Sequence, residues 1–253
     1  MPDYQLQDKV VIVTGASRGI GESTARFFAE CGARVVLAAR TEADLARVVA
    51  DIAEAGGTAT AVRTDVADAA EVDHLVEETL RIYGRLDAAF NNAGGGHMPK
   101  PLAELSEDDF DASVRGNMRS TFLCMRREIQ AMSKNGGGAI VNMSSSAGIQ
   151  AAPRMGAYCA AKHGVIGLTK AAALDYGGEN IRVNVVAPGP IQTHRLQQIP
   201  EETRASMMRA IPLKRLGDPA DVARTVAWLC SAGADFITGA VIPIDGGKTI
   251  ANA

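Results

Sequence analysis

Three polar side chains in the second half of the sequence could together move a proton to or from a substrate oxygen. Tyr158 and Lys162 stand four residues apart in a helical stretch that we expect to end near Tyr176, so both side chains share one helix face. A phenol with a pKa of about 10 is a poor base at neutral pH, but a neighbouring ammonium group favours the phenolate. Tyr158 could then exchange a proton with an oxygen that the Ser145 hydroxyl holds.

The positions of Ser145 and Asn117 add weight to this interpretation. Ser145 follows the expected strand Ala139–Met143, at its carboxyl end. Asn117 is an unusual residue inside a helical stretch, where it could open the helix and hold a water beside Lys162. Each residue alone has an ordinary explanation: Tyr-x-x-x-Lys pairs are frequent on helices, and serines and asparagines also serve as caps or face solvent. Their order along the chain and their placement at a strand end make the set informative.

The segment TGASRGIG at Thr14–Gly21 has the composition of a phosphate-binding turn and joins an expected strand to a helical stretch. Gly15 would permit a tight turn, Gly19 would let the backbone approach a pyrophosphate, and Gly21 would let helix and strand pack closely. The helix start would then offer free N–H groups and its positive dipole end to the anion. The spacing G-x-x-x-G-x-G differs from the common dinucleotide fingerprint, and a turn with incidental glycines is the alternative.

The end of the second expected strand bears on the choice of dinucleotide. An NAD site usually has an acidic residue there to bind the ribose hydroxyls, but Ala39 occupies that place and Arg40 follows. Glu42 fits better in the first turn of the next helix. Arg40 and Arg18 could bind a 2′-phosphate through charge-assisted hydrogen bonds, which predicts NADP(H). If both arginines are solvated surface residues, NAD(H) is the alternative.

The fold that must position these segments alternates short β-branched runs with helical stretches. Because most runs are apolar at consecutive positions, both faces of the sheet should be covered. Parallel neighbours need crossover helices, so the alternation predicts an α/β fold with a doubly wound parallel sheet. Pro243 places the last strand at a sheet edge. The expected strands are Val10–Thr14, Arg34–Ala39, Thr58–Arg63, Leu86–Phe90, Ala139–Met143, Arg182–Val186 and Ala240–Ile244.

Local signals also mark helix starts and one irregular stretch. Asp68 with Glu71 has the form of a capping box, and Asp218 stands before a proline at the first helical position. No shift in composition divides the chain, so we expect residues 1–253 to form one domain. Residues 188–212 contain four prolines and are either a mobile substrate lid or an ordinary surface loop with a short helix.

The composition excludes several classes of protein. The chain has 253 residues, of which 47% are hydrophobic and 22% charged, and its net charge of −3 argues against a nucleic-acid partner. The cysteines at 31, 124, 159 and 230 form no CxxC pair, which argues against a disulfide framework or a bound metal and suits a reducing compartment. The polar N-terminus and the lack of a long apolar run predict a cytoplasmic protein that does not bind a membrane.

The motifs as a set resemble those of the short-chain dehydrogenase/reductases, and the resemblance extends from Val10 to Gly247. In chain order they are TGASRGIG at Thr14–Gly21, DV at Asp65-Val66, NNAG at Asn91–Gly94, Asn117, Ser145, YCAAK at Tyr158–Lys162, PGPIQT at Pro188–Thr193 and DGG at Asp245–Gly247. The chain is similar to the 3-oxoacyl-[acyl-carrier-protein] reductase-like members in particular. The resemblance implies the sheet order 3-2-1-4-5-6-7, a Rossmann fold and a homotetramer.

The resemblance also implies roles for individual residues. Tyr158 would be the acid and base, Ser145 would orient the substrate, Lys162 would lower the tyrosine pKa and bind the nicotinamide ribose, and Asn117 would support a proton relay. Members with Arg at the place of Arg40, and no acid at that of Ala39, usually prefer NADP(H). The residues expected to bind the cofactor are Gly15, Ser17, Arg18, Gly19, Ile20, Gly21, Arg40, Asp65, Val66, Asn91, Ala93, Gly94, Tyr158, Lys162, Pro188, Gly189, Ile191 and Thr193.

The leading hypothesis is an NADP(H)-dependent oxidoreductase that interconverts a ketone and a secondary alcohol. The alternatives are an NAD(H)-preferring alcohol dehydrogenase of the same family and a dinucleotide sensor without turnover; an epimerase or dehydratase of the extended relatives would need a longer chain. The expected substrate-pocket walls are Gly95–Met98, Ile149–Met155 and Ile191–Met208, which suggest a largely apolar pocket. His97 is expected in a loop or in a pocket wall, and His194 with Arg195 could either bind a polar substrate group or lie on the surface. The substrate itself stays open.

Overall fold

Strands and helices alternate along the chain as the sequence predicts, and the computed structural model describes residues 4–251. Seven parallel strands form one sheet in the order β3-β2-β1-β4-β5-β6-β7, as predicted. The strands are β1 (Val10–Thr14), β2 (Arg34–Ala39), β3 (Thr58–Arg63), β4 (Ala88–Asn91), β5 (Gly138–Met143), β6 (Ile181–Pro188) and β7 (Val241–Ile244). β7, which contains Pro243, lies at the edge of the sheet, as expected for a residue that cannot donate to a ladder.

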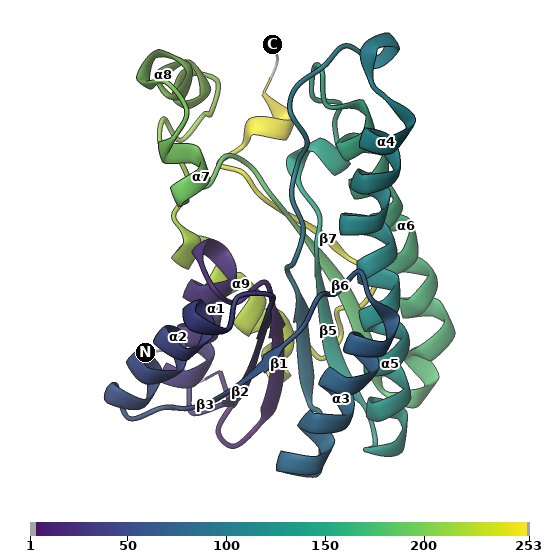
Figure 1. Cartoon of the computed structure of the whole chain (residues 1–253). Helices are drawn as coiled ribbons and strands as arrows, with labels where there is room; N and C mark the ends of the chain where they lie inside the picture. Colours follow the sequence, from purple (N-terminus) through teal and green to yellow (C-terminus); the bar gives the residue numbers. More distant parts are fainter. Residues whose placement is uncertain (1–3, 252–253) are drawn as a thin grey trace.

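Helices cover both faces of this sheet (Figure 1). They are α1 (Gly19–Glu30), α2 (Glu42–Glu54), α3 (Ala69–Tyr83), α4 (Glu107–Ser113), α5 (Ser120–Lys134), α6 (Gly156–Tyr176), α7 (His194–Gln197), α8 (Glu201–Arg209) and α9 (Pro219–Cys230). The short 3₁₀ turns are η1 (Leu102–Glu104), η3 (Ser146–Gly148), η4 (Gly177–Glu179), η5 (Ala232–Ala234) and η6 (Lys248–Ile250), and η2 (Val114–Arg119) is a π-helical segment between α4 and α5. None of the helices within residues 4–251 combines the length and apolar character that a bilayer crossing needs.

Two hydrophobic cores lie on opposite faces of the sheet. Val11 and Val13 of β1 pack in the core that α1, α2 and α9 cover, whereas Ile12 between them packs in the core that α3, α5 and α6 cover. All three side chains are fully buried. Successive strand residues point to opposite faces, so a strand with a helical layer on each side must be apolar at every position. This explains the continuous apolar runs in the sequence.

Strand β4 differs from the prediction at both ends. It begins at Ala88 and not at Leu86, and just before it the Asp87 carboxylate accepts a hydrogen bond from the Val10 backbone N–H at 2.9 Å. The strand extends one residue further than predicted, to Asn91, which pairs with Asn142 of β5. β6 likewise runs on to Pro188, beyond the predicted end at Val186.

The predicted capping box at the start of α3 is wrong in one of its two bonds. The Asp68 carboxylate accepts from the backbone N–H groups of Ala70 and Glu71, as expected for an N-cap. The Glu71 carboxylate does not return to Asp68, because it accepts from the Asp65 backbone N–H and pairs with Arg63. A reciprocal box does form at α9, between Asp218 and Asp221.

The carboxyl ends of the strands meet at one end of the sheet, where parallel α/β proteins bind ligands. The turn before α1 and the segments that follow β4 and β5 all lie at this end. Figure 1 shows α7 and α8 standing at the same end, on the side opposite α4. These two helices make up most of residues 188–212, and none of the residues of α8 is buried.

Candidate active site

The glycine turn before α1 has the conformation that a phosphate-binding turn requires. Gly15 and Gly19 have φ angles of 64° and 61°, the left-handed region that favours glycine. A Cβ at Gly21 would lie 2.2 Å from the Gly15 carbonyl oxygen, so only glycine allows α1 to approach this closely. No side chain among residues 4–251 caps the start of α1. Its first N–H groups are therefore available to an anion.

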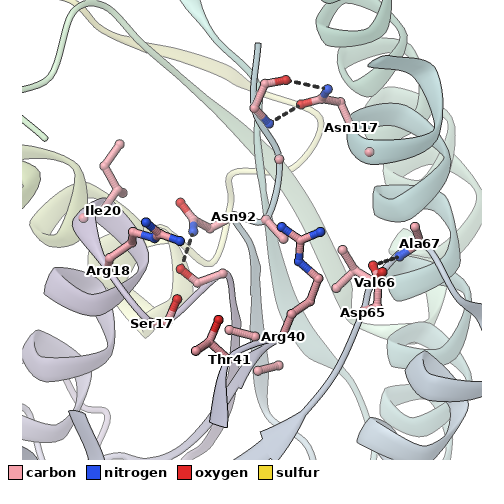
Figure 2. A pocket seen from close by; sticks show the side chains of 18 of the residues that line it. Ser17, Arg18, Ile20, Arg40, Thr41, Asp65, Val66, Ala67, Asn92 and Asn117 are labelled. Atoms are coloured by element: carbon pink, nitrogen blue, oxygen red, sulfur yellow. Dashed lines mark hydrogen bonds between the residues drawn. The ribbon is translucent and has the colours of Figure 1, made fainter. Parts of the chain in front are cut away.

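A cavity of about 950 Å³ opens in front of this turn and is large enough for a dinucleotide (Figure 2). Its walls come from six parts of the chain that are distant in sequence but meet at the strand ends. The lining residues are Gly15, Ser17–Ile20, Ala38–Thr41, Thr64–Ala67, Asn92–Gly96, Ala112, Arg115–Asn117, Thr193, His194 and Gln198. The positive φ angles, the uncapped helix and the cavity volume together fit the pyrophosphate of a dinucleotide.

Arg18 and Arg40 extend into the cavity with exposed side chains (Figure 2). Within the described part of the chain, neither guanidinium group has an ion pair or hydrogen bond to a protein group. Arg47 nearby is different, because it pairs with Glu22 at 2.9 Å and donates to the Ser17 carbonyl at 3.2 Å. The two arginines that were predicted to bind a phosphate are thus the ones that keep their hydrogen-bond donors available.

Asn92 fastens the glycine turn to the end of β4. Its side-chain amide donates to the Thr14 and Gly15 carbonyls at 2.9 and 3.2 Å, and its backbone N–H donates to the Thr14 hydroxyl at 3.0 Å. On the far wall, one Asp65 carboxylate oxygen accepts from the Ala67 backbone N–H at 3.0 Å (Figure 2). These contacts hold the rim of the cavity in place before any ligand binds.

Two residues predicted to bind the cofactor point their side chains elsewhere. Asn91 is 2% exposed, and its amide faces Glu128 and Asn142 beneath the cavity. Ile191 is buried in the core below α9, where its Cδ1 lies against Gly217. Both can offer only backbone groups to a ligand. The residues after Asn91, namely Ala93 and Gly94, do line the cavity as predicted.

Lys162 is the buried cation of the site. It is 2% exposed, and its Nζ donates to the Met143 carbonyl at 2.8 Å. Burial lowers the pKa of this lysine to about 8, so the ammonium is still the main form at pH 7. The Nζ lies 5.7 Å from the centroid of the Tyr158 ring, on the same face of α6. A cation so placed can stabilise a tyrosinate.

Ser145 is held next to this pair by the turn that follows β5. Its Oγ accepts from the Ala147 backbone N–H at 3.1 Å, and the adjacent Ser144 hydroxyl donates to the Lys162 carbonyl at 2.9 Å. A Cβ at Gly148 would come within 2.9 Å of that same carbonyl, so the turn packs directly on α6. The turn that carries the half-buried Ser145 hydroxyl is therefore held rigidly against α6.

Asn117 lies in η2, where the helix widens from α to π geometry, as its unusual position predicted. π-Bulges of this kind occur frequently at functional sites. The Asn117 amide donates to the Gly95 carbonyl at 3.0 Å and accepts from the Gly95 N–H at 3.1 Å. A Cβ at Gly94 would lie 2.6 Å from Asn117 Oδ1 and 3.4 Å from Lys162 Nζ. The cavity thus ends at Asn117, and Lys162 Nζ lies just behind Gly94.

Some of the remaining predicted residues line the cavity, whereas Pro188 and Gly189 are not among its lining residues. Val66, Thr193 and His194 line it, while Gly189 packs against Asp245 at the end of β6. The His97 ring is half-buried and its Nδ1 lies 2.6 Å from the Met98 carbonyl; the side chain of Arg195 lies outside what the structure describes. Asn92 and Thr64 also line the cavity although they were not predicted, and their places after β4 and β3 could have indicated them. Arg115 and Gln198 line it too, and no sequence signal points to either.

The cavity has a phosphate-binding turn at one end and Gly94 with Asn117 at the other, and the Tyr158–Lys162 pair lies behind Gly94, outside the lining. This is the arrangement of a nicotinamide-dependent oxidoreductase. A family model described as enoyl-(acyl carrier protein) reductase matches residues 15–249. The chain belongs to the short-chain dehydrogenase/reductase family. Members of this family act on alcohol or carbonyl groups with NAD(H) or NADP(H).

Three similar proteins span nearly the whole chain. An A-factor type γ-butyrolactone 1′-reductase (1S-forming) from Streptomyces virginiae is 40% identical over 99% of this chain and 100% of its own length. A 2,5-dichloro-2,5-cyclohexadiene-1,4-diol dehydrogenase from Sphingobium indicum is 41% identical over 96% of this chain and 98% of its own. A 7α-hydroxysteroid dehydrogenase solved with NADH and 7-oxo glycochenodeoxycholic acid superimposes with a TM-score of 0.93 and 35% identity, covering 97% of this chain and 96% of that one.

Proposed function

We propose that this protein is an NADP(H)-dependent oxidoreductase that interconverts a ketone and a secondary alcohol, with Tyr158 as the acid and base. The observation that supports this most strongly is the buried ammonium group of Lys162, 5.7 Å from the Tyr158 ring centroid. It lies beside Gly94, which lines the dinucleotide cavity. Burying a cation costs free energy unless the cation is paired. A tyrosinate at Tyr158 would be a suitable partner for the Lys162 ammonium group.

In the proposed reaction, Tyr158 gives a proton to the carbonyl oxygen during reduction and takes it back during oxidation. The Ser145 hydroxyl holds the same oxygen, Lys162 lowers the pKa of the phenol, and Asn117 supports the return of the proton from solvent. The nicotinamide, when bound, supplies or accepts the hydride. The groups proposed to hold the dinucleotide are the glycine turn, Asp65, Val66, Ala93, Gly94, Lys162 and the segment Pro188–Thr193, with the backbone of Asn91 and Ile191.

The proposed preference for NADP(H) rests on Ala39, Arg40 and Arg18. An acid that would repel a 2′-phosphate is missing at Ala39, and both arginines offer donors into the cavity without a protein partner among the described residues. Arginine binds phosphate oxygens with two parallel hydrogen bonds, which makes it the preferred residue for this recognition. A preference for NADP(H) favours reduction of the ketone as the direction of the reaction in the cell.

The purified protein mixed with NADPH should reduce a ketone, measured as loss of the reduced nicotinamide by absorbance. The panel contains monocyclic ketones, a keto-steroid, a γ-butyrolactone that bears a side-chain ketone, a β-ketoacyl thioester and linear ketones. We expect kcat/KM with NADPH to exceed that with NADH by about tenfold or more, because one hydrogen bond from an arginine to the 2′-phosphate is worth about that factor. A preference for NADH would contradict the cofactor proposal alone. Tight cofactor binding without turnover of these ketones, or of the corresponding alcohols, would contradict the proposed activity.

We also propose that the chain forms a homotetramer in the cytoplasm. Phe110 of α4 and Phe122 of α5 are 43% and 45% exposed, which leaves large apolar side chains for a subunit contact. The four cysteines are free thiols, as a reducing compartment requires. Light scattering after size exclusion should give four times the chain mass of 26.5 kDa, and Phe122→Glu should lower that mass. A monomer at micromolar concentration would contradict the proposal of a homotetramer.

Residues 188–212 are proposed as a substrate lid, since α8 has no buried residue.

A further inference from the structure

A buried carboxyl group lies directly beneath the candidate active site and plays no part in the proposed reaction. Glu128 of α5 is 1% exposed, and the amide nitrogen of Asn91 donates to its Oε2 at 2.8 Å. The same nitrogen donates to Asn142 Oδ1 at 3.0 Å, and Asn142 Nδ2 donates in turn to the Thr169 hydroxyl at 2.9 Å. This chain of side chains, from Glu128 to Thr169, crosses β4 and β5 and joins α5 to α6.

The hydrogen bonds of this chain leave one buried acceptor without a donor. Both N–H bonds of the Asn91 amide are used, towards Glu128 and Asn142, whereas Asn91 Oδ1 is buried and has no partner among the described residues. A buried carbonyl of this kind costs free energy until a donor reaches it. The Glu128 carboxyl group already contacts the nitrogen of the same amide at 2.8 Å, and a carboxylic acid has the one O–H that the amide oxygen lacks.

The surroundings of Glu128 disfavour a carboxylate. Within residues 4–251 the carboxyl group has no ion pair; Lys162 of α6 directs its ammonium to Met143, and Arg127 of α5 pairs with Asp73 of α3. The titratable group near Glu128 is the buried thiol of Cys124, whose own pKa is raised by burial and by Glu128. An isolated buried carboxylate is costly. Burial raises the pKa of Glu128 to about 7, although the Asn91 hydrogen bond opposes the increase.

We propose that Glu128 is a positioning residue that acts as a neutral carboxylic acid, accepting a hydrogen bond from the Asn91 amide and donating its own proton to Asn91 Oδ1. This pairing fixes the Asn91 side chain, and the Asn91–Asn142 bond then fixes the carboxyl ends of β4 and β5 relative to each other. The cavity wall formed by Asn92, Ala93 and Gly94 begins one residue beyond Asn91. The next residue after Asn142 is Met143, whose carbonyl accepts the hydrogen bond from Lys162. The effect of Glu128 on turnover rests on the proposed function, but the protonation state of Glu128 does not.

The variant Glu128→Gln tests the proposal, because a glutamine amide reproduces both hydrogen bonds of the neutral acid and cannot ionise. Since the pKa is raised in the folded state, stability should be lost as pH rises from the ordinary glutamate range through about 7. We expect wild type and Glu128→Gln to melt at similar temperatures at pH 5, and the variant to melt several degrees higher at pH 9. In the infrared, wild type at pH 6 should show the C=O stretch of a protonated carboxylic acid that the variant lacks.

Activity provides the readout for positioning. With the substrate found in the panel, kcat of Glu128→Gln at pH 6.5 should lie within about twofold of wild type, and the ratio of variant to wild type should rise by about fivefold or more towards pH 9. Glu128→Leu, which removes both proposed hydrogen bonds between residue 128 and Asn91 but leaves the Asn91–Asn142 bond, should lower kcat more than it changes the KM for the cofactor. If Glu128→Leu does not fold, the infrared band of wild type and the melting curves of Glu128→Gln still test whether Glu128 is a neutral acid. A missing acid band, or parallel melting curves from pH 5 to 9, would overturn the proposal. If these hold but no turnover is found, only the proposed function fails.

Discussion

Tyr158→Phe should lower kcat by about 10³-fold while the protein still binds NADPH. General acid–base catalysis is worth about 10²- to 10⁴-fold, and phenylalanine keeps the ring that lies near Lys162 Nζ but has no proton to give. The buried ammonium of Lys162 stays in place, because its hydrogen bond goes to the Met143 carbonyl. The measurements are steady-state kcat with the substrate found in the panel and the dissociation constant of NADPH from its fluorescence.

The matched control for this variant is Tyr176→Phe. Tyr176 is half-buried at the far end of the same helix, where it packs on the core, so the change removes a phenol hydroxyl without touching the cavity. Its kcat should lie within about twofold of wild type. If Tyr158→Phe kept more than a tenth of the wild-type kcat, another group would have to supply the proton, and the proposed role of Tyr158 would be wrong.

Arg40→Ala should lower kcat/KM for NADPH by about 10- to 100-fold and leave that for NADH nearly unchanged. Hydrogen bonds to charged groups contribute about 1.5–3 kcal/mol, and each 1.4 kcal/mol corresponds to about tenfold. Because the Arg40 side chain is exposed to solvent, we expect the lower part of this range. Inhibition by 2′,5′-ADP should weaken in parallel, whereas inhibition by 5′-ADP should not.

Arg34→Ala is the control for Arg40→Ala. Arg34 begins the same strand, β2, but pairs with Asp8 at 2.7 Å at the opposite end of the sheet. Its loss removes one positive charge of the same kind and should leave both kcat/KM values unchanged. Equal losses with NADPH and NADH in Arg40→Ala would place the arginine near a part common to both dinucleotides, and the 2′-phosphate proposal would then be wrong.

The fold could be predicted from the sequence because its signals are local. Consecutive apolar residues such as Val10–Thr14 specify a strand covered on both faces, and alternating helices specify parallel neighbours. Gly15 and Gly21 could be assigned to a close turn because only glycine tolerates the geometry that the structure has there. The placement of Asn117 in a widened helix was also foreseen, since asparagine is unfavourable inside a regular helix.

The candidate site could be predicted only as far as motif order and strand ends allow. These signals led to Tyr158, Lys162 and Ser145, but not to the directions of the side chains around them. Asn91 belongs to the NNAG motif, yet its amide turns away from the cavity towards Glu128. Ile191 belongs to the segment Pro188–Thr193, yet its side chain is part of the core. A motif identifies a stretch of chain, whereas burial decides which of its members face a ligand.

Residue patterns alone indicate the α/β class and the stretch of chain on which each candidate site residue lies, and the family resemblance of the motifs implies the strand order. Only the tertiary structure decided which charged groups remain unpaired. Arg47 and Arg40 are both arginines near one cavity, but the first has Glu22 within 2.9 Å and the second has no partner among the described residues. Glu128 and Asn91 are 37 residues apart and meet only after the sheet forms. Conformational preferences act over a few residues, whereas hydrogen bonding and desolvation depend on whatever the fold brings alongside.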